Sequence, residues 1–221
     1  MLALLDITGC IITIDAIGTQ TEIARTIVDK GANYVLTLKA NHPTLYTQVK
    51  NWFESSGAAD FKDIDLSYEQ RVEASHHRRE HRQVWAVPNT AIPELYQASA
   101  WSGLQTVVMV IRVRRWNQTT REVQFYLSSL ACDAVAIGRA IRAHWGIENQ
   151  LHWVQDVTFR EDDSRIRTGH SPENMALLRR LAISLLNQET STKRSVRQKA
   201  KRAAMDVNYM LRVLASTLPP Q

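Results

Sequence analysis

Cysteine is scarce in this sequence, and several other features that mark specialised classes of protein are missing. The two cysteines, Cys10 and Cys132, lie far apart and form no CxxC pair, which argues against a zinc ribbon and a disulfide scaffold. The apolar opening "MLALLDITGCIITIDA" has no basic segment and is interrupted by Asp6, so we expect neither a signal peptide nor a membrane span. Internal repeats and low-complexity tracts are also missing. A reducing cytoplasm fits these absences.

The composition is that of a globular protein with a basic balance. Hydrophobic residues make up 44% of the 221 positions and charged residues 22%, which is ordinary for a folded chain. Lysine and arginine number 27 against 22 aspartates and glutamates, so the formal net charge is +5. A positive balance suits a polyanionic partner such as nucleic acid, although many unrelated proteins share it.

Asp15 directly follows a run of strand-forming residues, "IITI" at 11–14, and its carboxylate has no evident structural role there. Thr19 and Glu22 form the pattern of a capping box for the helix that follows, so Asp15 is not needed as its cap. A second buried strand is predicted at 33–38 after that helix. Strand, helix and strand make a βαβ unit with parallel strands.

In open α/β sheets, ligands bind at the carboxyl ends of the strands, so functional residues are expected there. Lys39 and Asn41 directly follow the second predicted strand, as Asp15 follows the first. We therefore expect these three side chains at the same edge of the sheet.

Polar and apolar residues alternate from about 67 to 130, in "LSYEQRVEA", "REHRQVWAV", "TVVMVIRVRRW" and "REVQFYLSSL". This period of two is typical of antiparallel strands with one face in the core. We expect a meander inserted as a sheet of its own rather than a continuation of the parallel one. Six of its basic residues are Arg78, Arg79, Arg82, Arg112, Arg114 and Arg115.

A long helix is predicted from Asp133 through "AVAIGRAIRAHWGIENQLHWV", and it places a carboxylate on its apolar stripe. Glu148 falls within about 20° of Ile137 around the helix axis. A buried glutamate is rare unless it is paired or binds a metal. The alternative is a helix rolled so that Glu148 is half exposed beside Arg142 or His152.

Two further helices are predicted after a polar loop. Ser171 and Pro172 open the first of them, and the second is basic and amphipathic. Its cations could form a solvated face or contact phosphates. They are Lys193, Arg194, Arg197, Lys199, Lys201 and Arg202.

The two acids, Asp15 and Glu148, have basic strands between them in the sequence. This arrangement suits a two-metal site for phosphoryl transfer, in which carboxylates hold two Mg²⁺ ions about 4 Å apart.

Four blocks of the sequence resemble successive blocks of the H-repeat-associated insertion-sequence transposases. They are "CIITIDAIGTQTEIARTIVDKGANYVLTLKANHPTLY", "HHRREHRQVW", "HWGIENQLHWVQDVTFREDDSRIRTGHSPENMALLRRLAISLL" and "KRAAMDVNYMLRVL". The H-repeat-associated transposases are DDE transposases with an RNase H-like catalytic domain, so the resemblance implies an α/β fold.

The resemblance also implies an activity and its partners. The activity is DNA cleavage at transposon ends, dependent on Mg²⁺ or Mn²⁺, followed by attack of a 3′-hydroxyl on target DNA. The partners are double-stranded DNA at terminal inverted repeats and at the target site, with a homodimer left open. The location is the bacterial cytoplasm, at the nucleoid, without a membrane.

Carried over by position, Asp15 matches the second acid of the triad and Glu148 the third. His144 stands where related transposases have arginine, and Gln155 where they have lysine. Several residues are expected at DNA on this resemblance and on charge: Lys39, Asn41, Arg78, Arg82, His144, Lys199, Lys201 and Arg202. Glu161 and Asp162 are second-choice acids. Zinc at His76, His77 and His81 is disfavoured, because no cysteine or fourth ligand is near.

The first aspartate of the family's triad lies in a segment that has no match in these residues. Asp6 is not a substitute for it, because Asp6 matches the family's helix before the Asp15 strand. We therefore expect an incomplete RNase H-like core, N-terminally truncated and catalytically defective. The predicted parts are a partial core at 1–44, a β-rich insertion at 45–132, the core helix with the next helix at 133–190, and a basic helix at 191–221.

Three alternatives to a defective transposase are open. The chain could be a DNA-binding fragment without catalysis, whose affinity would fall steeply with salt. It could be a metal-dependent nuclease that recruits another acid, such as Asp156. It could also be a remnant that folds poorly, which a non-cooperative melt would reveal.

Overall fold

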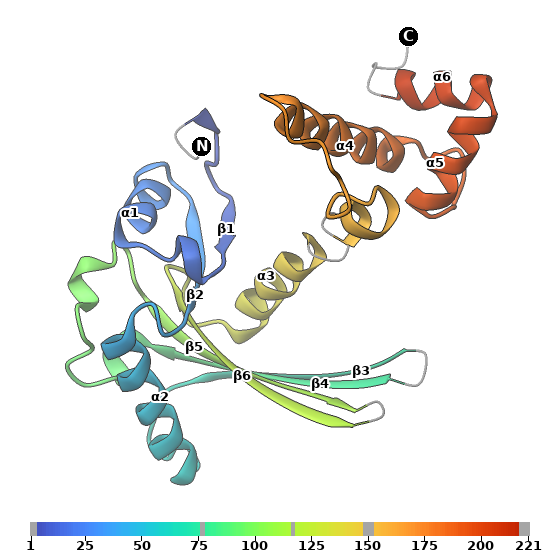
Figure 1. The fold of residues 1–221 in the computed structure, drawn as a ribbon. Coiled ribbons are helices and arrows are strands. Elements are labelled where there is room, and N and C mark those ends of the chain that lie inside the picture. The colour runs from blue at the N-terminus through green and yellow to red at the C-terminus, as the bar shows by residue number, and fades with distance from the viewer. Residues whose placement is uncertain (1–3, 76–77, 116–117, 148–152, 217–221) are drawn as a thin grey trace. The chain divides into compact units, whose positions relative to one another are not determined.

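The computed structural model describes residues 4–75, 78–115, 118–147 and 153–216 (Figure 1). The chain divides into two compact units, residues 1–144 and residues 145–221. Each described helix is too short or too polar to cross a membrane.

The first unit is built on one mixed sheet of six strands in the order β1-β2-β6-β5-β4-β3 (Figure 1). β1 and β2 are parallel, and every other neighbouring pair is antiparallel. The strands are β1 (Ile11–Ile14), β2 (Asn33–Leu38), β3 (Ser67–Ser75), β4 (Arg78–Pro88), β5 (Thr106–Arg115) and β6 (Thr119–Ser128). The mixed α/β class and the parallel βαβ unit are as predicted.

The prediction that the meander forms a sheet of its own is wrong. β6 lies antiparallel to β2, with Val35 opposite Ser128 and Leu38 opposite Phe125. The hydroxyl of Ser128 also donates to the carbonyl of Tyr34 at 2.9 Å. Alternation along a strand identifies which face is buried but not which strand is its neighbour, so the sequence could not show this pairing. The four-part domain division stays a prediction.

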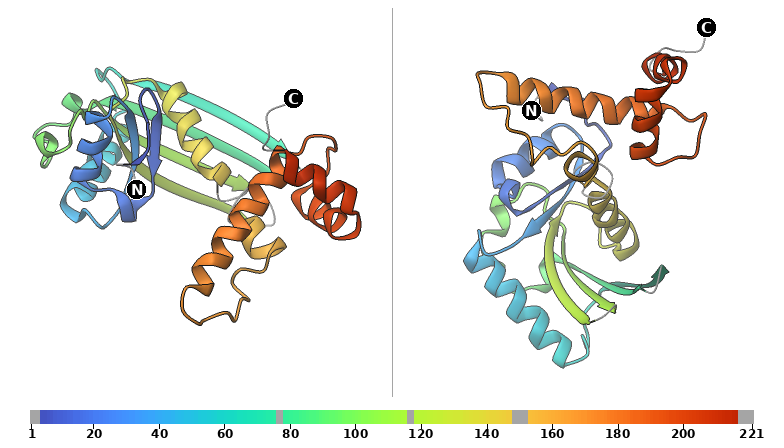
Figure 2. Two further views of the ribbon diagram at one scale, coloured as in Figure 1. Left: turned by 90° about the horizontal axis from the view of Figure 1, so that it is seen from above. Right: turned by 45° about the vertical axis from the view of Figure 1, so that its right-hand side comes forward.

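Helices α2 (Pro43–Ala58) and α3 (Ala134–Ile147) lie on opposite faces of the sheet (Figure 2). The apolar face of α2 packs into the main core cluster with alternate residues of the strands, including Phe53 against Phe125. On the other face α3 comes so close to β4 that a Cβ on Gly138 would lie 3.4 Å from a methyl carbon of Val84. Burial on both faces explains the nearly continuous apolar residues of β2.

The capping box predicted for the first helix is also wrong. Helix α1 (Thr21–Asp29) has Gln20 at its N-cap, and no side chain caps it. Thr19 is fully buried, and its hydroxyl donates to the backbone carbonyl of Thr37 at 2.8 Å. The threonine therefore ties the start of α1 to the end of β2 instead of capping the helix.

The second unit contains the π-helical turn η6 (Val154–Thr158) and helices α4 (Ser171–Gln188), α5 (Val196–Met205) and α6 (Val207–Ala215). The single basic helix predicted at the end is in fact two helices. Asp206 separates them, because its carboxylate accepts a hydrogen bond from the backbone N–H of Tyr209 at 3.0 Å and so caps α6. A small cluster holds the unit together: Leu185, Leu186, Tyr209 and Val213.

Candidate functional site

Asp15 directly follows β1 and precedes a short 3₁₀ turn, η2 (Ala16–Gly18). Its side chain is 58% exposed, and Oδ1 lies 3.2 Å from the Nζ of Lys39. The pKa of this carboxyl is lowered by the backbone N–H of Ala16 and, to a smaller extent, by Lys39 and His144. Asp15 is therefore an accessible carboxylate that stays ionised at neutral pH, which is the state that a hard divalent cation requires.

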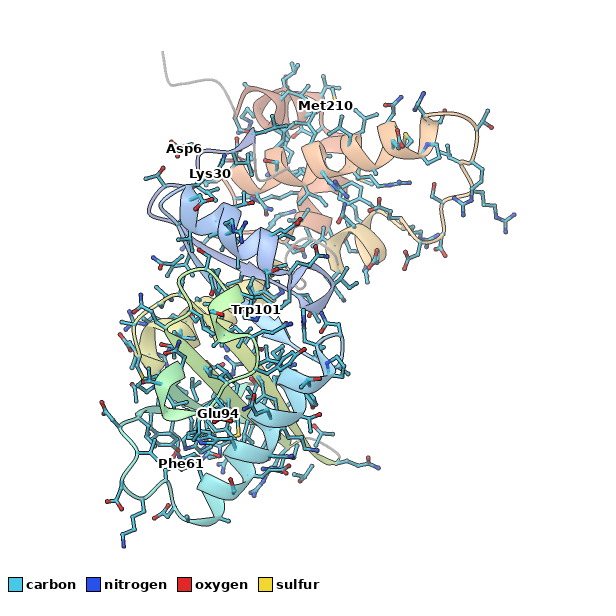
Figure 3. All side chains as sticks on the ribbon, turned by 90° about the vertical axis from the view of Figure 1, so that its left-hand side faces the viewer. Asp6, Lys30, Phe61, Glu94, Trp101 and Met210 are labelled. Atoms are coloured by element: carbon cyan, nitrogen blue, oxygen red, sulfur yellow. The ribbon has the colours of Figure 1, made fainter. Side chains whose placement is uncertain are left out.

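Side chains that follow β2 hold the η2 turn in place. Asn41 Nδ2 donates to the carbonyl of Ala16 at 2.7 Å. The Nε2 of His42 lies 2.7 Å from the carbonyl of Thr19, so this ring nitrogen must carry the donated proton. Trp101, labelled in Figure 3, packs edge-on against the His42 ring with centroids 5.2 Å apart. The backbone beside Asp15 is thus fixed from the neighbouring strand end.

Gly18 closes the turn where no larger residue fits. A Cβ at this position would lie 2.5 Å from Cγ2 of Ile14, inside the distance that carbon atoms tolerate. We expect Gly18→Ala to lower the free energy of unfolding by roughly 1–3 kcal/mol, measured by urea denaturation. Gly146→Ala is the matched control, because a Cβ there meets nothing within 4 Å. In helix α3 that change should be neutral or stabilising, and equal losses for the two variants would contradict the prediction.

His144 links the far end of α3 to β1. Its Nδ1 lies 3.0 Å from the hydroxyl oxygen of Thr13, two residues before Asp15. His144 therefore forms a hydrogen bond with Thr13 that holds α3 against β1 near Asp15, whether or not His144 also contacts DNA.

The expectation that Lys39 and Asn41 lie beside Asp15 is confirmed, because each bonds to Asp15 or to the residue after it. Glu148, the other predicted metal ligand, lies outside the described residues, and so do His76, His77 and His152. Within the part of the chain that the structure describes, no group of three or more histidine, cysteine or acidic side chains is placed to hold a metal ion. One exposed, ionised carboxylate still suits Mg²⁺, which keeps several waters and uses one or two protein carboxylates.

Four arginines of the meander are paired with acids of the same sheet: Arg71, Arg82, Arg112 and Arg114. Arg82 Nη2 lies 2.5 Å from Glu80, and Arg112 Nη2 lies 2.5 Å from Glu122. The side chain of Arg82 is only 12% exposed. This pairing offsets the positive charge of these arginines and, with the low exposure of Arg82, argues against that residue as a phosphate contact. Arg78 begins β4, and its side chain lies outside what the structure describes.

Lys199 is buried, which corrects its prediction as a DNA contact. Its Nζ donates to the carbonyl of Leu186 at 2.9 Å and to the carbonyl of Glu189, so it satisfies backbone groups at the end of α4. Arg202 lies over the ring of Tyr209, 4.5 Å from its centroid. Lys201, in contrast, is exposed on α5.

These features of fold and site agree with the comparisons to known proteins. The family model for the transposase DDE domain matches residues 1–185, so the chain belongs to the DDE transposases. YncI of Escherichia coli O157:H7, named as a candidate transposase, is 35% identical over 98% of this chain and 55% of its own length. YhhI of Escherichia coli strain K12, named as an H repeat-associated candidate transposase, is 34% identical over 98% of this chain and 58% of its own length. The chain thus spans just over half the length of these relatives.

Sequence reasoning missed two residues that hold the site, Thr13 and His42. Thr13 reads as an ordinary β-branched strand residue, and nothing local indicates that its hydroxyl reaches His144 across 131 positions. His42 directly follows Asn41 in the short segment after β2, so its place at the same sheet edge could have been inferred.

Proposed function

We propose that the chain is the larger part of the catalytic region of a transposase that cleaves DNA at the ends of an insertion sequence and joins it to target DNA. The observation that carries this proposal is the ionised Asp15 carboxylate. It stands at the carboxyl end of β1 on a turn fixed by Asn41 and His42, within a segment that matches the transposase DDE domain.

We further propose that β1, α1 and β2 belong to an RNase H-like core, with Asp15 as the second acid of the triad. Glu148 is proposed as the third acid on sequence grounds alone. The two carboxylates would hold Mg²⁺, or Mn²⁺ in its place. When bound, the metal would activate the attacking oxygen and stabilise the leaving one.

The chain's own residues then have distinct tasks. Asp15 presents its carboxylate from a backbone that β1 holds on one side and the η2 turn on the other. His144 ties the last turn of α3 to β1 through Thr13. The Lys39 side chain is 52% exposed, and its Nζ is near enough to Asp15 to contact a phosphate that approaches the carboxylate.

The 221 residues contain two of the three expected acids, so a polypeptide of these residues alone should support little strand transfer. The test is Mg²⁺-dependent nicking of a plasmid that carries the cognate terminal repeats. We expect near-background nicking from this polypeptide. Robust cleavage by it would refute the need for a further acid.

The role of Asp15 is tested with the protein expressed from its full genomic reading frame. Asp15→Asn keeps the shape of the side chain but removes its charge, and it should lower metal-dependent nicking by more than about 100-fold. Asp60→Asn, at an exposed aspartate after α2, is the control and should nick as the wild type does. Cleavage that survives Asp15→Asn would exclude Asp15 as a metal ligand.

A second candidate function is DNA binding without catalysis. The observation that favours it is the segment of residues 193–202, which contains six cations and no acid. Four of these side chains are exposed: Lys193, Arg194, Arg197 and Lys201. Such a surface would bind terminal repeats or other duplex DNA whether or not a metal is held at Asp15.

A further inference from the structure

The Lys39 ammonium occupies a position beside Asp15 that a bound cation would need. Its Nζ lies 3.2 Å from Asp15 Oδ1, and the two residues extend from the ends of the adjacent parallel strands β1 and β2. Both side chains are about half exposed, at 52% and 58%. The register of the two strands, with Ile14 opposite Leu36, brings the two strand ends to the same edge.

Lys39 is not needed to hold Asp15 in place. The backbone around Asp15 is fixed by Asn41 through the Ala16 carbonyl and by His42 through the Thr19 carbonyl. Among the described residues, Asp15 is the one partner found for the Lys39 ammonium. An exposed ion pair of this kind contributes little to stability, and the flexible lysine stem lets the ammonium move. Lys39 can therefore leave Asp15 without disturbing the turn.

We propose that Lys39 is an exchangeable counter-ion that couples DNA binding to cation binding at Asp15. In the free protein Lys39 pairs with Asp15 and lowers its affinity for a divalent cation. When DNA binds, Lys39 moves to a backbone phosphate and leaves the carboxylate to the cation. This inference rests on the proposed function, because it needs Asp15 to be a metal ligand.

The electrostatic basis is repulsion between like charges. A divalent cation on the Asp15 carboxylate would lie within a few ångströms of the ammonium, so one must weaken the binding of the other. A DNA phosphate offers the ammonium an alternative partner of the same charge as the carboxylate. Reciprocity follows from linkage: if DNA raises the affinity for the cation by some factor, the cation raises the affinity for DNA by the same factor.

The experiment measures Mn²⁺ binding to the full chain from the electron paramagnetic resonance signal of free Mn²⁺, with and without a short mixed-sequence DNA duplex. The main variant is Lys39→Met, which removes the ammonium and keeps the length of the side chain. Lys50→Met is the matched control, because Lys50 is similarly exposed at 48% and also pairs with a carboxylate, that of Glu54. Asp15→Asn reports whether Asp15 holds the ion at all.

We expect Lys39→Met to bind Mn²⁺ about tenfold more tightly than the wild type without DNA. DNA should raise the Mn²⁺ affinity of the wild type and of Lys50→Met, and this enhancement should fall toward onefold in Lys39→Met. If Asp15→Asn loses Mn²⁺ binding but Lys39→Met gains none, the coupling by Lys39 is overturned while the metal site stands. If Asp15→Asn binds Mn²⁺ as the wild type does, the metal site fails and the coupling fails with it.

Discussion

Replacing Glu189 by alanine should unfold the second unit under conditions in which the wild type is stable. The Glu189 side chain is buried, and its Oε2 accepts a hydrogen bond from the hydroxyl of Tyr209 at 2.6 Å. Its Oε1 accepts another from the backbone N–H of Ser191 at 2.8 Å. Lys199 Nζ lies 3.9 Å from the same carboxylate and is buried as well. The variant would leave a buried ammonium without its counter-charge and two donors without their acceptor.

The expected cost of Glu189→Ala is about 2–4 kcal/mol, because a buried charge and buried donors are left uncompensated. Hydrogen exchange at the amides of α5 and α6 measures it within the full chain. Glu173→Ala, in the first turn of α4, is the control, since Glu173 is 81% exposed and pairs with His170 at the surface. That change should alter stability by less than about 0.5 kcal/mol. Equal protection of α5 and α6 in the two variants would contradict the prediction.

Low pH should weaken the hydrogen-bond network around Glu189 and so lower the stability of the second unit. The pKa of Glu189 is lowered by its hydrogen bonds with Ser191 and Tyr209, with a smaller contribution from Lys199. Because the folded pKa lies below the unfolded value, the added stability is present above about pH 4.3 and is lost as the pH falls through the folded pKa. We expect Glu189→Gln, compared with the wild type, to lose stability at neutral pH and to depend less on pH in that acidic range. Parallel stability curves for the two proteins would show that Glu189 does not contribute in this way.

The sequence predicts the parts of the fold that depend on local patterns. The βαβ unit follows from two apolar runs and a helical spacing between them, and the four strands of the meander follow from alternation. The pairing of β6 with β2 does not follow, because it joins segments about 90 residues apart and depends on which sheet edge is free. The break at Asp206 could have been found, since aspartate is a strong N-cap and Val207 begins an apolar periodicity.

At the candidate site, too, some features follow from local sequence patterns and others depend on tertiary packing. The ends of parallel strands meet at one edge of a sheet, so the proximity of Lys39 and Asn41 to Asp15 could be predicted from order along the chain. The role of Asn41 could not, because its amide reaches a backbone carbonyl of the η2 turn rather than a ligand. Burial explains why Lys199 was wrongly predicted to contact DNA. Its sequence context is a run of cations, and only the packing of α4, α5 and α6 shows that this one cation faces the interior.

DNA affinity should depend on the exposed cations of residues 193–202 and not on positive charge in general. The test compares two triple variants of the second unit, each of which removes three exposed positive charges. One replaces Arg194, Arg197 and Lys201 by glutamine. The control replaces Arg160, Arg165 and Arg167, which lie in the loop before α4 among three acids: Glu161, Asp162 and Asp163.

The first triple variant should bind duplex DNA about 100-fold more weakly at low salt, because three phosphate contacts and their released counter-ions are lost. The slope of log affinity against log salt should become less steep by about 3, one for each lost contact. In the control the neighbouring acids already offset the arginines, so both affinity and slope should stay near the wild type. Gel shifts or fluorescence anisotropy over a salt series measure both quantities. Equal losses in the two variants would mean that net charge, and not the surface formed by residues 193–202, attracts the DNA.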